Sequence, residues 1–213
     1  VGSFYQPNLV ISDVNFLKTL PKREIICGYG EILKHAIIAD KKFFRYLEKN
    51  YLKILNLESP FIEKAIFKSC VIKKKVVEKD EKEKNLRKML NFGHTFAHAY
   101  EASKNFSKIL NHGEAVLLGI KTATKFSFKE KLIKKNEVNL ISKHLNYAKL
   151  PDKVDKFFSL KELGKILSFM TKDKKNSTDK INLILLKRIG RPILNKSYSK
   201  KYISKFLKEE LIN

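Results

Sequence analysis

Helical periodicity is the feature that most constrains this chain. Apolar residues recur every three or four positions along nearly every long segment, as they do in helices with one buried face. The pattern predicts helices over residues 23–39, from 59 to the charged stretch at 80–85, over 86–103 and over 199–211. Ser59, followed by Pro60, is expected to cap the second of these helices. A chain built from such segments packs helix against helix.

Other local signals complete the expected fold. Capping-box sequences at 111–114 and 159–162 predict two further helix starts. Two apolar runs on either side of Gly190 predict a β-hairpin over 181–194, and residues 10–13 suggest a short strand. There is no internal repeat, no Gly- or Ser-rich linker and no G-x-G-x-x-G or P-loop motif. We therefore expect one mainly α domain with a small β-hairpin.

Composition places the chain among globular proteins. Its 213 residues are 43% apolar and 31% charged, which is enough apolar material to bury a core. No apolar run reaches the roughly 18 residues of a membrane-spanning helix, so no membrane association is predicted. Cys27 and Cys70 are too few for a disulfide framework, which favours two buried thiols acting as small apolar fillers in the reducing cytoplasm. The chain begins at Val1 in structured-looking sequence, so we expect a piece of a longer protein.

The formal charge of +23 raises the question of nucleic-acid binding. Only five of the 45 basic residues are Arg, whereas proteins that read nucleic acids depend on Arg for bidentate contacts. The lysines are spread along the whole chain instead of forming a patch. A Lys-rich helical nucleic-acid-binding domain therefore stays an alternative, and an anionic small-molecule substrate is the preferred partner.

Polar residues form an unusual line on the predicted helix over 86–103. Arg87, Asn91, His94 and His98 are spaced four, three and four, which places them on one helical stripe. Apolar neighbours on both sides suggest that the stripe faces an internal cleft. The alternative is a solvated face with two incidental histidines.

His94 and His98 also have the i, i+4 spacing of a two-histidine metal half-site. Thr95 occupies the place of the general-base Glu in the H-E-x-x-H motif, so a zinc peptidase is not favoured.

Further metal-ligand candidates lie elsewhere in the chain. If Asn111 caps a helix, His112 stands at the positive end of the helix dipole, where a neutral imidazole is favoured. Glu31 offers a carboxylate, with Lys34 either a functional neighbour or a surface ion-pair partner. His35 is the weaker ligand candidate.

Lys73 is a second anomaly. The spacing places it on an apolar ridge with Ile66, Cys70 and Val77, where a buried ammonium requires an anionic partner. The alternative is that the run of lysines at 73–75 is an ordinary basic surface.

Several motifs together resemble one family. They are Leu20 to Glu24, Gly28 to Lys34, Asp80 to Glu83, Arg87 to His98, His112 to Ala115 and Asp173 to Lys175. In this order they resemble the C-terminal domain of the 3-dehydroquinate synthases, and the opening V-G-S-F-Y-Q-P is similar to the segment that follows that family's nucleotide-binding domain.

The resemblance implies a helical C-terminal domain of the dehydroquinate synthase-like fold, with the N-terminal nucleotide-binding α/β domain absent from this chain. Residues 1–22 would be the connector from that domain, and 23–213 the metal- and substrate-binding domain. The implied enzyme is a cytoplasmic, zinc- or cobalt- and NAD-dependent lyase of the shikimate pathway, which leads to chorismate and the aromatic amino acids. It converts 3-deoxy-D-arabino-heptulosonate 7-phosphate to 3-dehydroquinate and phosphate, and is expected to be a homodimer.

The resemblance also implies roles for individual residues. The metal would be held by Glu31, His94 and His112, in place of the His94–His98 pair that spacing alone suggested. Catalysis would involve His98, Lys34 and Asn91. Substrate would be bound by Lys73, Arg87, Asn91, His98 and Lys174. No cofactor-binding residue for NAD is expected in this chain, and an isolated fragment is expected to be inactive.

Two residues depart from the family pattern, Asn85 and Ala97, each replacing a glycine, and neither is a proposed ligand. Within the same superfamily, an inosose or valiolone synthase acting on a sugar phosphate without a carboxylate is the alternative.

Overall fold

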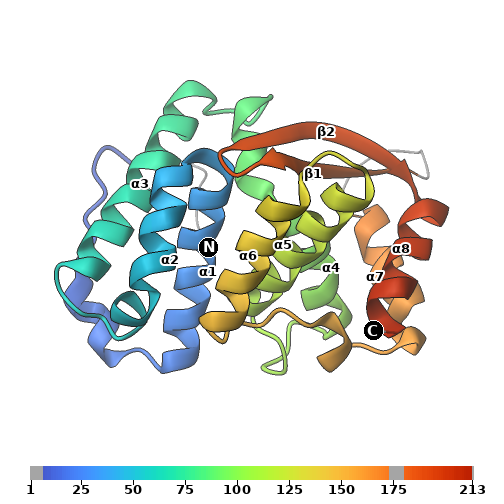
Figure 1. Cartoon of the computed structure of the whole chain (residues 1–213), viewed down its shortest axis with the longest axis horizontal. Helices are drawn as coiled ribbons and strands as arrows, with labels where there is room; N and C mark the ends of the chain where they lie inside the picture. The colour runs from blue at the N-terminus through green and yellow to red at the C-terminus, as the bar shows by residue number, and fades with distance from the viewer. Residues whose placement is uncertain (1–6, 173–179, 213) are drawn as a thin grey trace.

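The computed structural model describes residues 7–172 and 180–212, which form a mainly helical structure with one antiparallel hairpin (Figure 1). The α-helices are α1 (Lys22–Ala39), α2 (Lys41–Leu55), α3 (Phe61–Lys79), α4 (His94–Ser103), α5 (His112–Lys129), α6 (Lys135–Tyr147), α7 (Leu163–Lys172) and α8 (Lys200–Ile212). The strands are β1 (Lys180–Arg188) and β2 (Arg191–Ser199). Short 3-10 helices are η1 (Val14–Thr19), η2 (Leu86–Asn91), η3 (Val154–Lys156) and η4 (Leu160–Glu162). The predicted mainly α class with one hairpin is confirmed.

α5 is the central helix of the fold. Six consecutive residues, 115–120, are buried, and such a run covers every side of a helix. α1 and α4 pack against it. The buried hydroxyls of Thr122, Thr124 and Ser127 donate to carbonyls four residues earlier in α5, so each buried polar group is satisfied within the helix. Among the described helices, none is both long and apolar enough to cross a membrane.

The hairpin is fastened to the helices by backbone hydrogen bonds. The N–H of Leu186 donates to the Ser127 hydroxyl at 3.0 Å, and the N–H of Ile189 donates to Glu137 Oε2 at 2.7 Å. At the turn, the N–H of Gly190 donates to the carbonyl of Ile37 at 2.7 Å. Figure 1 shows the strands running beside α5 and α7, so they close one side of the helical assembly.

Two helices lie where the sequence analysis predicts none. α2 follows α1 after the single residue Asp40, whose carboxylate accepts a hydrogen bond from the backbone N–H of Phe43 at 2.9 Å. α6 buries Ile141 and Leu145 on its inner side. Both helices carry apolar residues at helical spacing, so the signal that would have predicted them is present in the sequence.

The predicted single helix over 86–103 is wrong. The chain forms η2 up to Asn91 and then turns at Gly93, whose φ is +80°, and α4 begins at His94. A Cβ on Gly93 would lie 2.7 Å from the backbone nitrogen of Ile120. The break therefore lets the start of α4 approach α5 at backbone distance, and the four-residue polar line does not lie on one helix.

Two smaller predictions, a helix cap at Ser59 and a short strand at residues 10–13, are also wrong. α3 begins at Phe61, after Pro60, and Ser59 does not cap it. Residues 10–13 form no strand in the described structure, where Asp13 instead caps η1 by accepting the N–H of Asn15 at 2.8 Å.

Lys73 and Cys70 lie on the exposed side of α3, so the buried positions predicted for them are wrong. Both residues are exposed, so Cys70 is not an apolar filler and Lys73 is not on the buried ridge. The buried residues of α3 are Ile62, Ala65, Ser69 and Val76. This stripe is one residue out of phase with the predicted ridge, which rotates it by about 100° around the helix axis.

Candidate metal centre

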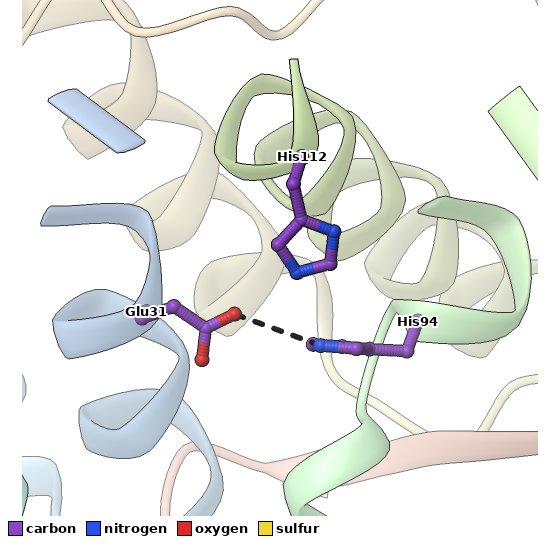
Figure 2. Close-up of side chains that lie close together, drawn as sticks. All are labelled: Glu31, His94 and His112. Carbon is purple, nitrogen blue, oxygen red and sulfur yellow. Dashed lines mark ion pairs between the residues drawn. The ribbon is translucent and has the colours of Figure 1, made fainter. Parts of the chain in front are cut away.

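Three side chains from three helices meet at one point of the structure. Glu31 lies in α1, while His94 and His112 are the first residues of α4 and α5. One potential ligand atom from each residue lies within 4.8 Å of the others. Figure 2 shows the carboxylate and both rings pointing toward a common centre. The metal set implied by the family resemblance is therefore assembled, although its members are far apart in sequence.

Close backbone packing brings these helices together. A Cβ on Gly113 would lie 2.3 Å from the Cα of Cys27, so α5 and α1 touch at a point where only glycine fits. The Cys27 thiol donates to Asn111 Oδ1 at 2.9 Å, and Arg23 holds the Glu114 carboxylate with two hydrogen bonds. The start of α5, and with it His112, is thus fixed against the helix that carries Glu31.

The two oxygens of Glu31 have different environments. Oε2 accepts a 2.6 Å hydrogen bond from Lys34 Nζ, whereas Oε1 is buried and has no hydrogen-bond partner. Burial alone would raise the pKa of Glu31, but the charge and hydrogen bond of Lys34 outweigh it and hold the pKa below its ordinary value. Glu31 is therefore a carboxylate with one oxygen available to a cation.

Lys34 is buried, with only 4% of its side chain exposed, so the interpretation of Lys34 as a surface ion-pair partner is wrong. Burial lowers the pKa of its ammonium, and the Glu31 carboxylate partly offsets this effect.

His94 presents its Nε2 atom to the centre. Its Nδ1 lies 3.3 Å from the carbonyl oxygen of Phe92, which only accepts hydrogen bonds, so Nδ1 carries the proton. Nε2 lies 3.6 Å from Glu31 Oε1. Burial, followed by the nearby Lys34 charge, lowers the pKa of His94 to about 4. The ring is neutral at neutral pH, which is the form that binds a metal.

His112 is the first residue of α5, and it lies between Asn111 and Glu114, which form a complete capping box. The predicted capping box is confirmed, as is the one between Ser159 and Glu162. The Nδ1 atom of His112 lies 3.0 Å from Glu101 Oε2.

The donor set fits zinc. Two imidazole nitrogens and one carboxylate oxygen form a ligand set of catalytic zinc sites, which keep a fourth position open. In a tetrahedral site with bonds of about 2.1 Å, ligand atoms lie about 3.4 Å apart, close to the 3.6 Å between His94 Nε2 and Glu31 Oε1. The buried, unpartnered oxygen of Glu31 supports the same conclusion, because a cation would satisfy it.

A pocket of about 280 Å³ adjoins this centre. It is lined by Glu83, Lys88, Asn91, His94, Thr95, His98, Asn182, Leu183, Ile184 and Asn195. His94 belongs to both the metal cluster and the pocket wall. The ring of His98 lies 5.3 Å from that of His94 and 6.0 Å from that of His112, measured between centroids. A molecule in the pocket would therefore contact His98 beside the metal position.

Asn91, also implied by the resemblance, lines the pocket at the end of η2. Its Nδ2 donates to Glu83 Oε1 at 2.6 Å, which orients the amide. Asn91 and His98 thus reach one pocket even though they belong to different helical segments.

The remaining predicted site residues lie elsewhere. Arg87 is half-buried, its guanidinium donating to the carbonyl of Glu81 at 2.6 Å, and it is not among the described residues that line the pocket. Lys73 is exposed on α3 and is not among the described residues that line the pocket. Lys174 lies outside the described residues.

Among the described residues, His35 lies outside the cluster formed by Glu31, His94 and His112. Its Nδ1 is 2.7 Å from the Ser69 hydroxyl, and the ring is buried. Burial, followed by the charge of Lys34, lowers the pKa of His35 to about 4.

Five polar residues of the pocket wall were not predicted as site residues from the sequence: Glu83, Lys88, Thr95, Asn182 and Asn195. Thr95 Oγ1 donates to the carbonyl of Asn182 at 3.2 Å and so connects α4 to β1. Asn182 lies 87 residues after Thr95 in the sequence, and no local pattern predicts that the amides of the hairpin line the same pocket.

Comparisons with known proteins agree with this arrangement. The family model described as 3-dehydroquinate synthase C-terminal matches residues 28–176. The 3-dehydroquinate synthase of Pelagibacter ubique is 62% identical over 211 residues, which are 99% of this chain and 57% of that protein. That of Aliivibrio fischeri (strain MJ11) is 43% identical over 190 residues, 89% of this chain and 51% of that protein. The chain spans about half the length of the curated relatives it matches.

Solved structures share the fold. A 2-deoxy-scyllo-inosose synthase, complexed with carbaglucose-6-phosphate, NAD+ and Co2+, matches with a TM-score of 0.82 and 26% identity over 98% of this chain and 58% of that one. A 2-epi-5-epi-valiolone synthase from Streptomyces hygroscopicus, with NAD+ and Zn2+ bound, matches with a TM-score of 0.80 and 20% identity over 93% of this chain and 54% of that one. Because the family model covers well over half of its residues, the chain belongs to the 3-dehydroquinate synthase C-terminal family.

Proposed function

We propose that this chain is the metal- and substrate-binding part of a 3-dehydroquinate synthase, which converts 3-deoxy-D-arabino-heptulosonate 7-phosphate to 3-dehydroquinate and phosphate. The observation that carries the proposal is the cluster of Glu31, His94 and His112 beside a polar pocket that contains His98 and Asn91. The 62% identity to a 3-dehydroquinate synthase supports it.

In this proposal Glu31 Oε1 and the Nε2 atoms of His94 and His112 hold zinc, or cobalt as in the inosose synthase structure. When bound, such a metal supplies Lewis-acid stabilisation for a substrate hydroxyl as it loses its proton. Lys34 holds Oε2 of the same carboxylate and so directs Oε1 toward the metal.

His98 and Asn91 bind the phosphate end of the substrate in the pocket, together with Lys174. A side-chain amide and an imidazole donate hydrogen bonds to phosphate oxygens, and His98 also holds or releases a proton at a ring nitrogen as phosphate leaves.

Positive charges near the pocket suit a substrate with two anionic ends. Lys34 is buried beside the metal position. Burial lowers the pKa of Lys34, and the positive charge of Lys73 lowers it further. We assign the substrate carboxylate to Lys73 and Arg87, because a guanidinium forms paired hydrogen bonds with a carboxylate. In this assignment Arg87 exchanges its bond to the Glu81 carbonyl for one to the substrate.

The rest of the proposed enzyme lies outside this chain. Hydride transfer requires NAD, and we assign its binding mainly to a nucleotide-binding domain joined through residues 1–22, with 23–213 as the metal- and substrate-binding domain. We further propose that the whole enzyme is a cytoplasmic homodimer.

The direct test uses the polypeptide that the gene encodes, supplied with zinc and NAD. We expect release of phosphate from 3-deoxy-D-arabino-heptulosonate 7-phosphate together with formation of 3-dehydroquinate, and loss of both in His98→Ala. Turnover of a carboxylate-free sugar phosphate in preference to the heptulosonate would support the inosose or valiolone synthase function instead. A salt-dependent shift of DNA without turnover of either sugar would support the nucleic-acid alternative.

A further inference from the structure

We propose that Glu101 is a positioning residue for the metal centre, which holds the His112 ring so that its Nε2 atom faces the metal. The inference rests on the proposed metal site and adds a residue that lies outside the ligand set. Its starting point is the contact between Glu101 Oε2 and His112 Nδ1, 3.0 Å apart.

The chemistry of this contact determines which nitrogen of His112 can bind metal. An ionised carboxylate only accepts hydrogen bonds, so Nδ1 of the ring must carry the hydrogen. The neutral ring then has its lone pair on Nε2, the atom on the opposite side of the imidazole. A carboxylate behind a metal-binding histidine fixes the orientation of the ring and makes the ligand nitrogen more basic.

Exposure shows why His112 needs such a partner. Half of its side chain is exposed, compared with 12% for His94, which is held by the protein packed around it. An exposed ring on the first residue of a helix keeps more rotational freedom than a buried one. Glu101 is only 16% exposed, so the carboxylate that holds the ring is itself restrained by its surroundings.

The position of Glu101 links two of the helices that build the centre. Glu101 lies seven residues after His94 and three after His98, so all three are on one face of α4. α4 therefore contributes one proposed ligand and also holds the ligand contributed by α5. The backbone packing of Gly93 against Gly119 keeps the two helices close enough for this contact.

The test is zinc affinity, measured by competition with a chromophoric chelator in the polypeptide that the gene encodes. We expect Glu101→Ala to weaken zinc binding by about 10- to 100-fold, the usual effect of removing such a partner. Glu101→Gln should recover part of this loss, because its amide oxygen still accepts from Nδ1. Glu101→Asp, whose shorter side chain draws the oxygen away from the ring, provides a second loss variant if Glu101→Ala does not fold.

Two controls separate positioning from other effects. Glu130→Ala makes the same change in charge at the far end of α5, where Glu130 accepts from Tyr202, and should leave zinc affinity unchanged. In a His112→Ala background, the weak residual zinc affinity of Glu31 and His94, still measurable by competition, should not fall further with Glu101→Ala, because its action passes through His112. The visible absorption of bound Co²⁺, which reports coordination geometry, should change in Glu101→Ala and not in Glu130→Ala.

Each other outcome contradicts the inference in a distinct way. If Glu101→Ala binds zinc as tightly as the parent while His112→Ala loses zinc, the proposed role of Glu101 is wrong and the proposed metal site is unaffected. The same loss with and without His112 would mean that Glu101 does not act through this ring. A parent protein that binds no zinc would overturn the proposed metal site itself, and this inference with it.

Discussion

Lys34 Nζ lies 2.6 Å from Glu31 Oε2, and the ammonium is almost completely buried at this contact. The pair is asymmetric, because 35% of the Glu31 side chain is exposed and its second oxygen points to the histidines. The carboxylate therefore neutralises a buried cation and offers a ligand atom at the same time. In the metal-free protein the pair is chiefly a structural element, and its removal should affect stability before any chemistry is considered.

Glu31→Gln should destabilise the metal-free protein, because it leaves the Lys34 ammonium buried without a counter-charge. Breaking fully buried pairs costs 3–5 kcal/mol, and the partial exposure of Glu31 reduces this to about 1–3 kcal/mol. Urea unfolding in the presence of a chelator measures the change. The double variant Glu31→Gln/Lys34→Met should regain most of the lost stability, and a double variant no more stable than Glu31→Gln would contradict the pairing.

Gly113→Ala should destabilise the protein and weaken metal binding together. The added Cβ would meet the Cys27 backbone at 2.3 Å, so α5 must move away from α1 and His112 must move away from Glu31. Overpacking of this kind costs about 1–3 kcal/mol, and here the clash is with backbone, which cannot rotate away. Thermal unfolding and zinc titration measure the two effects.

Gly28→Ala is the matched control on α1. A Cβ on Gly28 meets nothing within 4 Å, and alanine is the better helix former by up to about 1 kcal/mol. We expect this variant to be as stable as the parent or more stable, with unchanged zinc binding. Equal losses in both variants would mean that the close contact between α1 and α5 is not what holds the centre together.

Stability should fall in mild acid because of buried neutral histidines. Burial lowers the pKa of His144 to about 4, and its Nε2 is 2.8 Å from the Tyr29 hydroxyl in a pocket shared with Phe44 and Tyr51. The unfolded chain binds a proton near pH 6.5, whereas the folded chain does so only near pH 4. The contribution of the neutral, buried His144 ring to the free energy of unfolding is therefore fully present above pH 6.5. It is lost as the pH falls toward 4.

The measurement is the free energy of unfolding at pH 7 and at pH 4.5, in the parent and in His144→Phe. The parent should lose about 2 kcal/mol more than the variant over this interval. Equal pH dependence in the two proteins would show that the His144 ring is not held neutral by the fold.

Helix patterns were sufficient to predict the class of the fold and several of its elements. α1, α8 and the hairpin lie where periodicity and turn residues place them, within a few residues at each end. The break at Gly93 was not predictable, because its cause is the backbone of α5, which approaches Gly93 only in the folded chain. The misplacement of Cys70 and Lys73 has a different origin, since two stripes on α3 carry apolar residues and only tertiary packing selects between them.

The candidate site was predictable only in part from the residues themselves. Spacing picked out His94 and His98 as a metal pair, and residue type and position made His112 and Glu31 further candidates. The resemblance was needed to select Glu31, His94 and His112 as the ligand set. Spacing within one helix says nothing about residues on other helices, and here the ligands come from α1, α4 and α5. Glu101 was missed for a related reason, because an acidic residue near the end of a helix is common and its contact with His112 appears only after α4 and α5 pack.

Substrate choice should depend on Arg87. In the complete enzyme, Arg87→Ala should lower kcat/KM for the carboxylated heptulosonate. The decrease should correspond to a loss of about 2–4 kcal/mol in transition-state stabilisation, as expected when one partner of a buried charge pair is removed. Steady-state kinetics of the parent and of Arg87→Ala give kcat/KM for the heptulosonate and for a carboxylate-free sugar phosphate. For the carboxylate-free sugar, kcat/KM should be the same in both proteins. Intact turnover of the heptulosonate by Arg87→Ala would remove the carboxylate-binding role and favour an inosose or valiolone synthase.

The ligand set is the central claim, and metal content measured across four single variants tests it most directly. The protein should bind one zinc, detected by elemental analysis after dialysis, and Glu31→Ala, His94→Ala and His112→Ala should each lose it. His98→Ala should keep the metal, because His98 lies beside the cluster and is not a member of it. If His98→Ala loses zinc while His112→Ala retains it, the metal is held by the histidine pair on α4, and the three-helix centre described here is wrong.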